Sequence, residues 1–494
     1  MRNHAEHILE LLAAQGARMS GLSSDSRSLA AGEAFVAYPG SRSDGRVFIP
    51  AAIARGASAV LWERGGFRWN AKWRVPNLPV DELRGLAGHL AHEIYGRPSE
   101  RLWTMGVTGT NGKTSCSYWL AQACSASGAR TALVGTLGTG FPGKLEGGIN
   151  TTPDAIPLHR SLAGLLAEGA QGVAMEVTSI GLDQGRVNGV AFGAALFTNL
   201  SRDHLDYHGD MESYARAKQR LFETPGLKHA VLNLDDVQGV NLARMLAGQV
   251  NRAGYSCFEG VAAHAGLERY AEARAIEVSA RGIRFDLESS WGEARIESPM
   301  LGRFNVSNLL GVLATLLVSG VPLESATAAI AKIGPVPGRM QRLGGAGKPL
   351  VVVDYAHTPD ALEKTLVALK DVARAGGGRL VAVFGAGGDR DRGKRPLMGT
   401  VASRHADAVV VTSDNPRSED PAAIIKEIEA GVSVAHEVIE DRHEAIARAI
   451  AQAAAADVVL LAGKGHEPYQ EIAGRRLPFS DTLEAERALA GWSR

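Results

Sequence analysis

The stretch Gly106-Val107-Thr108-Gly109-Thr110-Asn111-Gly112-Lys113-Thr114 is a glycine-rich turn between the apolar run 102–107 and the helix-compatible segment 113–127. Glycines let a backbone approach an anion closely, and the N-terminus of the following helix offers unpaired N–H groups. Lys113 supplies a mobile positive charge, and the Thr114 hydroxyl is a candidate Mg²⁺ ligand. The expected ATP-binding residues of this loop are Gly109, Thr110, Asn111, Gly112, Lys113, Thr114 and Ser115.

One position departs from the general phosphate-binding pattern. That pattern places a glycine five residues before Gly112, where this sequence has Val107, and the glycines fall at Gly106 and Gly109 instead. An ordinary glycine-rich connection is the alternative. Gly-Lys-Thr between a strand and a helix nevertheless favours phosphate binding.

Length and composition narrow the class of protein. A chain of 494 residues exceeds what one hydrophobic core usually supports, so we expect two to four domains, with three preferred. Lys+Arg 53 against Asp+Glu 53 gives a net charge of +0, which argues against a nucleic-acid partner. The three cysteines lack metal-ligand spacing and form no disulfide framework. We expect small-molecule partners.

The N-terminus lacks the apolar core of a signal peptide, and no apolar stretch approaches the length of a membrane span. We therefore expect a cytoplasmic protein without membrane insertion. A monomer is a further expectation.

Strands and helices alternate along the chain, which predicts an α/β fold with a doubly wound, largely parallel sheet in the centre. Residues 1–100 are expected to form a small α/β domain, residues 101–337 the central P-loop domain, and residues 338–494 a Rossmann-like domain. Ligands of such sheets bind beyond the carboxyl ends of the strands.

Two polar segments follow expected strands of the central domain. The apolar strand 173–176 ends in Glu176, a carboxylate suited to Mg²⁺, although a simple loop charge is the alternative. The strand 194–197 leads into residues 198–208, which read Thr-Asn-Leu-Ser-Arg-Asp-His-Leu-Asp-Tyr-His.

The expected helix 214–222 places Tyr214 and Lys218 on its inward apolar face. An inward lysine is costly unless its charge is paired or removed. A lysine that reaches solvent along the surface is the alternative.

The last domain repeats this arrangement, with expected strands at 350–353, 380–384, 408–411 and 458–461 that each precede a polar loop. The run Gly385-Ala386-Gly387-Gly388 lacks the spacing of a dinucleotide-binding loop, so we reject NAD. Arg390, Arg417 and Glu467 offer two cations and one anion. Because arginine forks select carboxylates, this set favours an amino acid with an additional carboxylate.

The loop variant Gly109–Thr114 and the run Thr-Asn-Leu-x-x-Asp-His-Leu-Asp-x-His at 198–208 resemble the Mur ligase family, ATP-dependent enzymes that build the peptidoglycan peptide. The resemblance implies ATP and Mg²⁺ as cofactors. It implies that His204 binds a second magnesium ion and that Lys218 is carbamylated to N6-carboxylysine. The implied catalytic residues are Lys113, Glu176, His204 and Lys218, and the implied metal ligands are Thr114, Glu176, His204 and the carbamate of Lys218.

The same resemblance implies further nucleotide contacts by Asn305, Asn308, Arg339 and Asp354. It also implies a site for a UDP-muramoyl dipeptide, formed by Ser24, Ser26, Ser41, Arg42, Ser43, Asn150, Thr151, Thr152, Thr178, Gln184 and Arg186. Two positions depart from the family pattern: Ile180 replaces a histidine, and Gln341 replaces a frequent glutamate.

The tetrapeptide Asp414-Asn415-Pro416-Arg417 resembles the motif of family members that add meso-diaminopimelate as the third residue. The implied contacts to this amino acid are Arg390, Asp414, Asn415, Pro416, Arg417, Gly463 and Glu467. The implied reaction joins meso-2,6-diaminopimelate to UDP-N-acetylmuramoyl-L-alanyl-D-glutamate through an acyl phosphate.

Three alternatives stay open at this point. Two are ligases: a lysine-adding member of the family, and a folylpolyglutamate synthase-like enzyme. The third is a P-loop transporter or regulatory module that ligates nothing.

Overall fold

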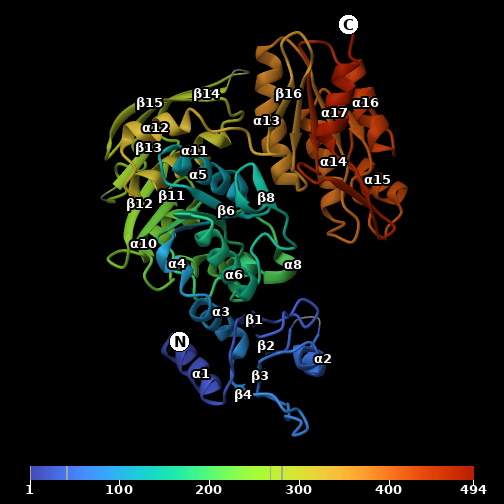
Figure 1. Cartoon of the computed structure of the whole chain (residues 1–494). Coiled ribbons are helices and arrows are strands. Elements are labelled where there is room, and N and C mark those ends of the chain that lie inside the picture. The colour runs from blue at the N-terminus through green and yellow to red at the C-terminus, as the bar shows by residue number, and fades with distance from the viewer. Residues whose placement is uncertain (1, 41–42, 268, 280–281, 494) are drawn as a thin grey trace. The chain divides into compact units, whose positions relative to one another are not determined.

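The computed structural model describes every residue except 1, 41–42, 268, 280–281 and 494 (Figure 1). The chain forms two compact units. The first unit comprises Met1–Tyr255, Val261–Tyr270 and Gly311–Ala326, and the second comprises Ser256–Gly260, Ala271–Leu310 and Thr327–Arg494.

The first unit begins with a four-stranded sheet in the order β1-β2-β3-β4, and all of its strand pairs are parallel. Side chains alternate between its two faces. Ala34 and Val36 pack in the core under α1 and α3, whereas Phe35 and Ala37 pack on the side of α2. The elements are α1 (Arg2–Ala14), β1 (Gly21–Ser23), β2 (Glu33–Ala37), η1 (Gly45–Phe48), α2 (Ile49–Ala54), β3 (Ala59–Glu63), β4 (Asn77–Val80) and α3 (Leu83–Ile94).

The rest of the first unit contains part of a larger sheet, with its strands in the order β12-β11-β10-β5-β9-β6-β7-β8. Strands from β12 to β6 pair in parallel, and β7 and β8 form an antiparallel extension. The elements are α4 (Pro98–Arg101), β5 (Trp103–Thr108), α5 (Lys113–Ala126), β6 (Thr131–Gly135), β7 (Gly138–Phe141), β8 (Lys144–Glu146), α6 (Ala155–Ala167), β9 (Gly172–Glu176), α7 (Ser179–Asp183), β10 (Ala194–Phe197), α8 (Leu205–His208), α9 (Met211–Gln219), β11 (His229–Asn233), α10 (Val237–Met245) and β12 (Asn251–Ser256).

The register of this sheet positions the polar strand ends. Val107 on β5 lies opposite Glu176 on β9, and Thr108 lies opposite Phe197 on β10. The residues that follow β5, β9 and β10 therefore meet at one edge of the sheet. Helix α5 packs against β5, β6 and β9, so its N-terminus lies at the same edge.

The chain then forms three long strands and two helices. The first strand pairs antiparallel with the second, and the second pairs antiparallel with the third. These elements are β13 (Arg269–Ser279), β14 (Gly282–Ser289), β15 (Gly292–Ser298), α11 (Phe304–Val318) and α12 (Leu323–Ile330). Helix α11 begins at Phe304, so Asn305 and Asn308 lie in its first two turns.

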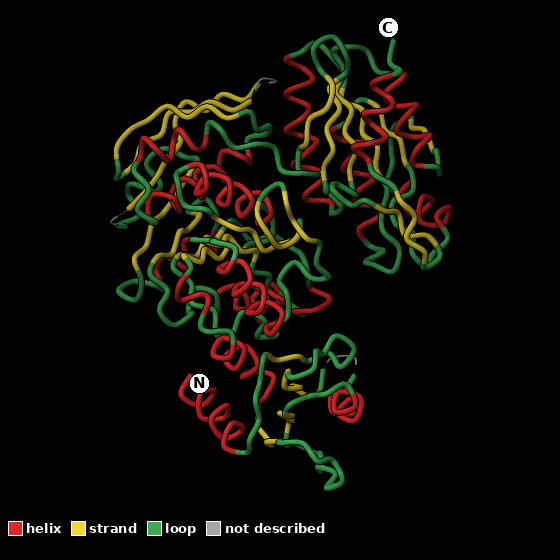
Figure 2. The backbone as a smooth tube through the Cα atoms, viewed as in Figure 1, coloured by secondary structure: helices red, strands yellow, loops and turns green. Residues whose placement is uncertain are grey.

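The last sheet, in the second unit, has the order β16-β17-β21-β18-β19-β20. All of its pairs are parallel except β16 with β17, and the antiparallel strand β16 was not expected. Figure 2 shows helices on both sides of it. The elements are β16 (Gln341–Gly344), β17 (Leu350–Asp354), α13 (Pro359–Ala375), β18 (Leu380–Phe384), α14 (Lys394–His405), β19 (Ala408–Val411), α15 (Pro421–Glu429), β20 (His436–Val438), α16 (Arg442–Gln452), β21 (Val458–Ala462), the hairpin β22 (Tyr469–Ile472) and β23 (Arg475–Pro478), and α17 (Asp481–Ala490).

Successive side chains on these strands point to opposite faces of the sheet, and each face packs in its own hydrophobic core. Val352 and Leu460 face the core of α13, α14 and α15, whereas Val351 and Leu461 face the core of α16 and α17. The expected α/β fold with parallel sheets is confirmed. Ala462 lies opposite both Asp354 and Phe384, so the loops after β17, β18 and β21 leave the sheet at one edge.

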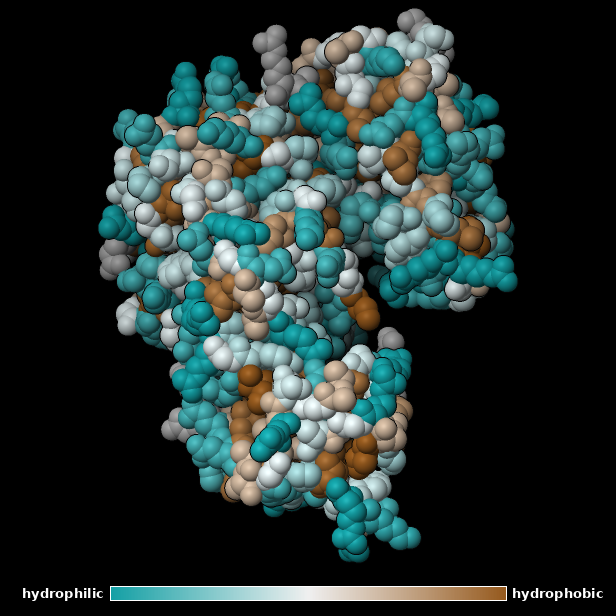
Figure 3. Space-filling model, viewed as in Figure 1, coloured by the Kyte–Doolittle hydropathy of each residue, from teal (hydrophilic) through white to brown (hydrophobic). Residues whose placement is uncertain are grey.

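Among the described residues, no helix is both long and apolar enough to cross a membrane. On the face seen in Figure 3, hydrophobic residues form small separate groups among hydrophilic ones.

Candidate active site

The glycine-rich loop of the first unit is shaped by its contacts with the end of β10. Gly109 has φ +150°, and a Cβ there would collide with Thr198 Oγ1. Thr198 donates to the Asn111 carbonyl over 2.6 Å, and the Asn199 carboxamide oxygen accepts from the Asn111 N–H over 3.0 Å. The loop conformation thus depends on glycine and on two residues almost ninety positions away.

Lys113 begins helix α5, and its side chain turns back over the loop. Its Nζ donates to the carbonyls of Gly109 and Thr110, each over 2.9 Å. The ammonium group therefore lies where a phosphate group bound by the loop would meet it, beside the N-terminus of helix α5.

Glu176 is 1% exposed, and its carboxylate lies directly against α5. Thr114 Oγ1 donates to Glu176 Oε2 over 2.8 Å. The Thr136 N–H donates to Glu176 Oε1 over 2.7 Å, and the Thr136 hydroxyl lies 3.2 Å from Oε2. A hydroxyl and a carboxylate in contact are the hard oxygen donors that Mg²⁺ prefers, so these residues fit the expected ion.

Lys218 is buried on α9, as expected, and its Nζ donates to the Gly109 carbonyl over 2.8 Å. Its Nζ also lies 4.3 Å from the centre of the Tyr214 ring. Burial, with a further contribution from Lys113, lowers the pKa of Lys218 well below its ordinary value. The uncharged amine is therefore more favoured than in an ordinary lysine, and it lies beside the phosphate-binding loop.

His204 precedes α8 with φ +53°, a strained conformation for a residue with a side chain. Its ring centre lies 6.0 Å from that of Tyr214, whose hydroxyl lies 3.2 Å from Thr110 Oγ1. Burial lowers the pKa of His204, which favours the neutral imidazole that binds metals. Among the described residues, no three His, Cys, Asp or Glu side chains gather closely enough to hold a metal by themselves.

A second polar cluster lies at the ends of β9 and α7. Thr152 Oγ1 donates to the Glu176 carbonyl over 2.9 Å and lies 3.1 Å from Thr178 Oγ1. Arg186 donates to the Thr152 carbonyl and to Gln184 Oε1, each over 2.8 Å. Four of the predicted substrate residues are therefore brought together.

The remaining predicted substrate residues of the first unit are more scattered. Thr151 lies 3.0 Å from Thr136 through their hydroxyls, and Asn150, which precedes it, is half-buried. Ser24 is hydrogen-bonded to Tyr38, Ser26 is buried, and the Ser43 carbonyl accepts from Gly40. Ser41 and Arg42 lie outside the described residues. Ile180 is half-buried within α7.

The predicted nucleotide contacts of the second unit form two groups. Asn305 donates to the Leu301 carbonyl over 2.7 Å and accepts from Asn308 over 2.9 Å. The Asp354 carboxylate accepts from the N–H groups of Met340 and Ala356, and burial raises its pKa.

Arg339 stacks on Tyr355, with its Cζ 4.3 Å from the ring centre. Gln341 Oε1 accepts from the Gly338 N–H over 2.8 Å. Gln341 therefore keeps the hydrogen-bond acceptor that a glutamate would provide at this position.

The expected amino-acid-binding loops of the second unit lie against each other. Asn415 donates to Glu467 Oε2 over 2.7 Å. Gly463 has φ +117°, and a Cβ there would collide with the Asp414 carboxylate. Arg417, also left-handed at φ +53°, donates from its guanidinium to the Gly388 carbonyl over 2.6 Å. Arg390 is exposed and donates to the Asp389 carbonyl.

Several residues of these sites were not among the predicted ones. Thr136 immediately follows strand β6, so the rule that identified Glu176, a polar residue at a strand end, would have found it. Lys464 lies between two glycines after β21, but nothing in that local sequence shows that its side chain is buried, which depends on the tertiary structure. Arg442 is also fully buried and donates to the carbonyls of Ser413 and Ala462, the residues that precede the two loops.

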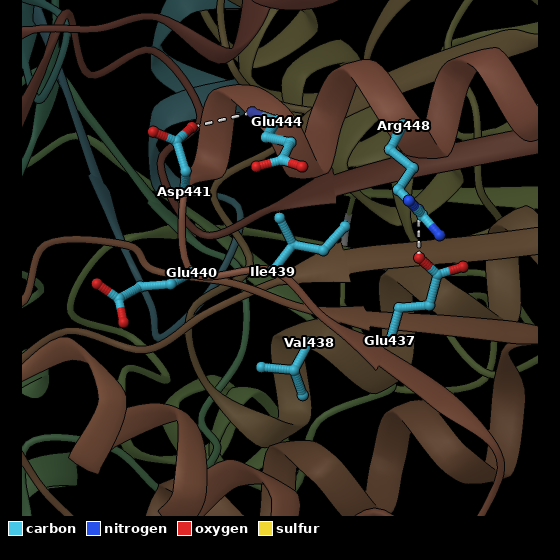
Figure 4. A pocket seen from close by; sticks show the side chains of 7 residues that line it. All are labelled: Glu437, Val438, Ile439, Glu440, Asp441, Glu444 and Arg448. Carbon is cyan, nitrogen blue, oxygen red and sulfur yellow. Dashed lines mark hydrogen bonds and ion pairs between the residues drawn. The ribbon is translucent and has the colours of Figure 1, made fainter.

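A pocket of about 720 Å³ lies elsewhere, between the edge strand β20 and helix α16 (Figure 4). It is lined by Glu437, Val438, Ile439, Glu440, Asp441, Glu444 and Arg448. None of the predicted site residues lines it, and Arg448 is paired with Glu437. We assign it no role in the site.

Comparison with known proteins defines the class. The sequence matches the Mur ligase family catalytic domain over residues 18–95, the Mur ligase middle domain over 107–316 and the Mur ligase glutamate ligase domain over 338–465. With whole-length relatives at about half identity, the chain belongs to the Mur ligase family.

Those relatives are UDP-N-acetylmuramoyl-L-alanyl-D-glutamate–2,6-diaminopimelate ligases. The protein of that name from Chromobacterium violaceum is 51% identical over 488 residues, covering 98% of this chain and 97% of its own length. That from Pseudomonas aeruginosa is 52% identical over 477 residues, covering 95% of each.

A solved structure of a ligase with the same name has a TM-score of 0.70 at 38% identity, covering 96% of this chain and 95% of its own. The MurF ligase of Thermotoga maritima, solved in complex with ADP, shares the fold with a TM-score of 0.65 at 20% identity, covering 97% and 99% of the two chains.

Proposed function

We propose that this chain is the ATP-dependent ligase that joins meso-2,6-diaminopimelate to UDP-N-acetylmuramoyl-L-alanyl-D-glutamate in peptidoglycan precursor synthesis. The observation that carries the proposal is the loop Asp414–Arg417, whose Asn415 bonds to Glu467. It occurs in a chain that is 51% identical, over 98% of its length, to a relative with that name.

The first step is phosphoryl transfer. The loop N–H groups and Lys113 hold the ATP phosphates, and the γ-phosphoryl group passes to the side-chain carboxylate of D-glutamate, which releases ADP and leaves an acyl phosphate. Thr114 and Glu176 would hold Mg²⁺, which neutralises phosphate charge when it is bound. A free carboxylate is a poor electrophile, so this activation is what makes amide formation feasible.

The second step is attack by the amino acid. An uncharged amine of diaminopimelate attacks the acyl carbon, a tetrahedral intermediate forms, and the C–O bond to phosphate breaks as the amine loses a proton. Arg417 and Arg390 supply guanidinium groups for the carboxylates, and Glu467 supplies an acceptor for an ammonium group. Asp414, Asn415, Pro416 and Gly463 complete this subsite.

We infer that Lys218 is carbamylated. Its lowered pKa favours the free amine, which attacks CO₂ and loses a proton to give a carbamate. The product is an anion beside Lys113 and His204, and it removes the cost of burying an ammonium group. His204 and this carbamate would hold the second magnesium ion.

The proposed site for the UDP-muramoyl dipeptide joins two regions of the first unit. Ser24, Ser26, Ser41, Arg42 and Ser43 would contact the uridine end, and Asn150, Thr151, Thr152, Thr178, Gln184 and Arg186 the sugar and peptide. Asn305, Asn308, Arg339 and Asp354 would contact ATP.

The domain boundaries after residues 100 and 337 also remain proposals, and the family matches at 18–95, 107–316 and 338–465 support them. A cytoplasmic location and a monomeric state are further proposals.

The test is phosphate release with ATP, Mg²⁺ and UDP-N-acetylmuramoyl-L-alanyl-D-glutamate, comparing meso-diaminopimelate with L-lysine. We expect release that depends on diaminopimelate and that falls at least about tenfold in Arg417→Lys, which keeps the charge but loses the fork. Arg404→Ala removes an exposed arginine of the same unit and serves as the matched control. Equal release with lysine would reject the amino-acid assignment, and activity only with a folate substrate would reject UDP-N-acetylmuramoyl-L-alanyl-D-glutamate as the acceptor substrate.

A further inference from the structure

The side chain of Lys464 lies fully buried between the two amino-acid-binding loops of the second unit. It follows Gly463 at the end of β21 and turns inward rather than toward solvent. Its Nζ donates to Asn415 Oδ1 over 3.0 Å and to Glu467 Oε2 over 3.2 Å, and it lies 3.9 Å from Asp414 Oδ1. One ammonium group therefore contacts three residues of the proposed subsite.

These contacts fix the orientation of the Asn415 amide. Its Oδ1 accepts from Lys464 and from the Glu471 N–H, the latter over 2.9 Å. Its Nδ2 is thereby directed at Glu467, to which it donates over 2.7 Å. A reversed amide would place an N–H group against an ammonium group, so Lys464 selects one of the two orientations.

The same contacts orient Glu467. Lys464 and Asn415 both donate to Oε2, so Oε1 is the oxygen that takes neither bond. The buried ammonium also offsets one of the two carboxylates, Asp414 and Glu467, that lie near it. The remaining negative charge matches the single ammonium group that the subsite must hold once the other amine is the uncharged nucleophile.

We propose that Lys464 is a positioning residue for the incoming diamino acid, acting through Asn415 and Glu467 without touching the substrate. The proposal rests on the proposed function. If Lys464 formed only a structural ion pair, it would stabilise the fold, and replacing it would not change the affinity for one substrate more than for the others. A positioning residue changes the affinity for the amino acid and leaves the affinities for ATP and the dipeptide substrate unchanged.

The experiment measures initial rates of the full-length enzyme with each substrate varied in turn. Lys464→Met keeps the unbranched stem without charge, and Lys464→Gln keeps a donor without charge. Lys348→Met is the matched control, because Lys348 lies in the same unit and its Nζ donates to the Leu489 carbonyl over 2.7 Å.

We expect the KM for meso-diaminopimelate to rise about tenfold or more in Lys464→Met, because charge-assisted hydrogen bonds are lost. The rise is expected to be smaller in Lys464→Gln. The KM values for ATP and the dipeptide substrate should stay within about twofold of wild type. In Lys348→Met all three KM values should be unchanged.

An unchanged KM for diaminopimelate in a folded Lys464 variant, or an equal rise for all three substrates, would overturn the proposal. If both variants fail to fold, a crystal structure of the wild-type enzyme with diaminopimelate decides. Lys464 bonded to Asn415 and Glu467, with Glu467 Oε1 on the ligand, would support the proposal, and Lys464 bonded directly to the ligand would overturn it. Wild-type enzyme that does not use diaminopimelate would overturn the proposed function itself, which the variants alone cannot do.

Discussion

Thr114 Oγ1 donates to Glu176 Oε2 over 2.8 Å, joining the first turn of α5 to the end of β9. The two residues are 62 positions apart in the chain. They meet because β9 pairs with β5, the strand that leads into the phosphate-binding loop. A hydroxyl and a carboxylate are thereby held in contact beside the loop.

This pair predicts strong effects on the rate. Glu176→Gln keeps the shape and the hydrogen bond but removes the charge, so we expect kcat to fall by about 10²-fold or more. Thr114→Ser, which keeps the hydroxyl, should stay within about tenfold of wild type, and Thr114→Val should resemble Glu176→Gln. Initial rates over a range of Mg²⁺ concentrations check this. Full activity of Glu176→Gln at ordinary Mg²⁺ would contradict the metal role.

The proposed carbamate predicts chemical rescue. Lys218→Ala should lose nearly all activity, by about 10²-fold or more, and millimolar formate or acetate should restore part of it by supplying a carboxylate. Lys218→Arg keeps a positive charge and should show no rescue. Mass spectrometry of the native enzyme in bicarbonate should detect the added CO₂. A fully active Lys218→Arg would argue against the modification.

The burial of His159 predicts that acid destabilises the fold. Its Nε2 lies 2.9 Å from the Asn188 carbonyl, and burial lowers the pKa of His159 to about 3. Between the ordinary pKa of about 6.5 and this value, the unfolded state binds a proton that the folded state does not. The free energy of unfolding should therefore fall, as pH drops through that window, by at most about 1.4 kcal/mol per pH unit from this residue.

Urea unfolding at several pH values measures this dependence. His159→Gln can still donate to Asn188 but cannot titrate, so its stability should fall less steeply between about pH 6 and pH 4. Equal slopes for wild type and variant would show that His159 does not control acid stability.

Arg442 and Asp481 form a fully buried ion pair, with contacts of 2.6 and 2.7 Å. Arg442→Met leaves the Asp481 carboxylate buried without its partner and should cost about 3–5 kcal/mol of unfolding free energy. The double variant Arg442→Met/Asp481→Leu should recover much of that loss, because neither charge remains. Thermal or denaturant unfolding of the three proteins checks this, and a double variant no more stable than the single one would refute it.

Local patterns in the sequence were enough to predict much of the fold. Apolar runs predicted β5, β9, β10, β17, β19 and β21, and the polar residue at the end of β9 predicted Glu176 as a candidate Mg²⁺ ligand. The roles of Asp414 and Gly463 were implied by the resemblance to the family. The inward position of Lys218 followed from helical periodicity alone. These features were predictable because strand and helix periods are properties of short segments.

The tertiary structure decided which of these segments meet. Thr136 reaches Glu176, Asn199 reaches the glycine-rich loop, and Lys464 reaches Asn415 through pairings of strands that are distant in the chain. The antiparallel position of β16 and the burial of Arg442 also depend on such pairings. Strand order and register arise from the packing of whole layers, so no single segment encodes them. The sequence by itself therefore determined the kinds of chemical group at the site, and the tertiary structure determined their partners and orientations.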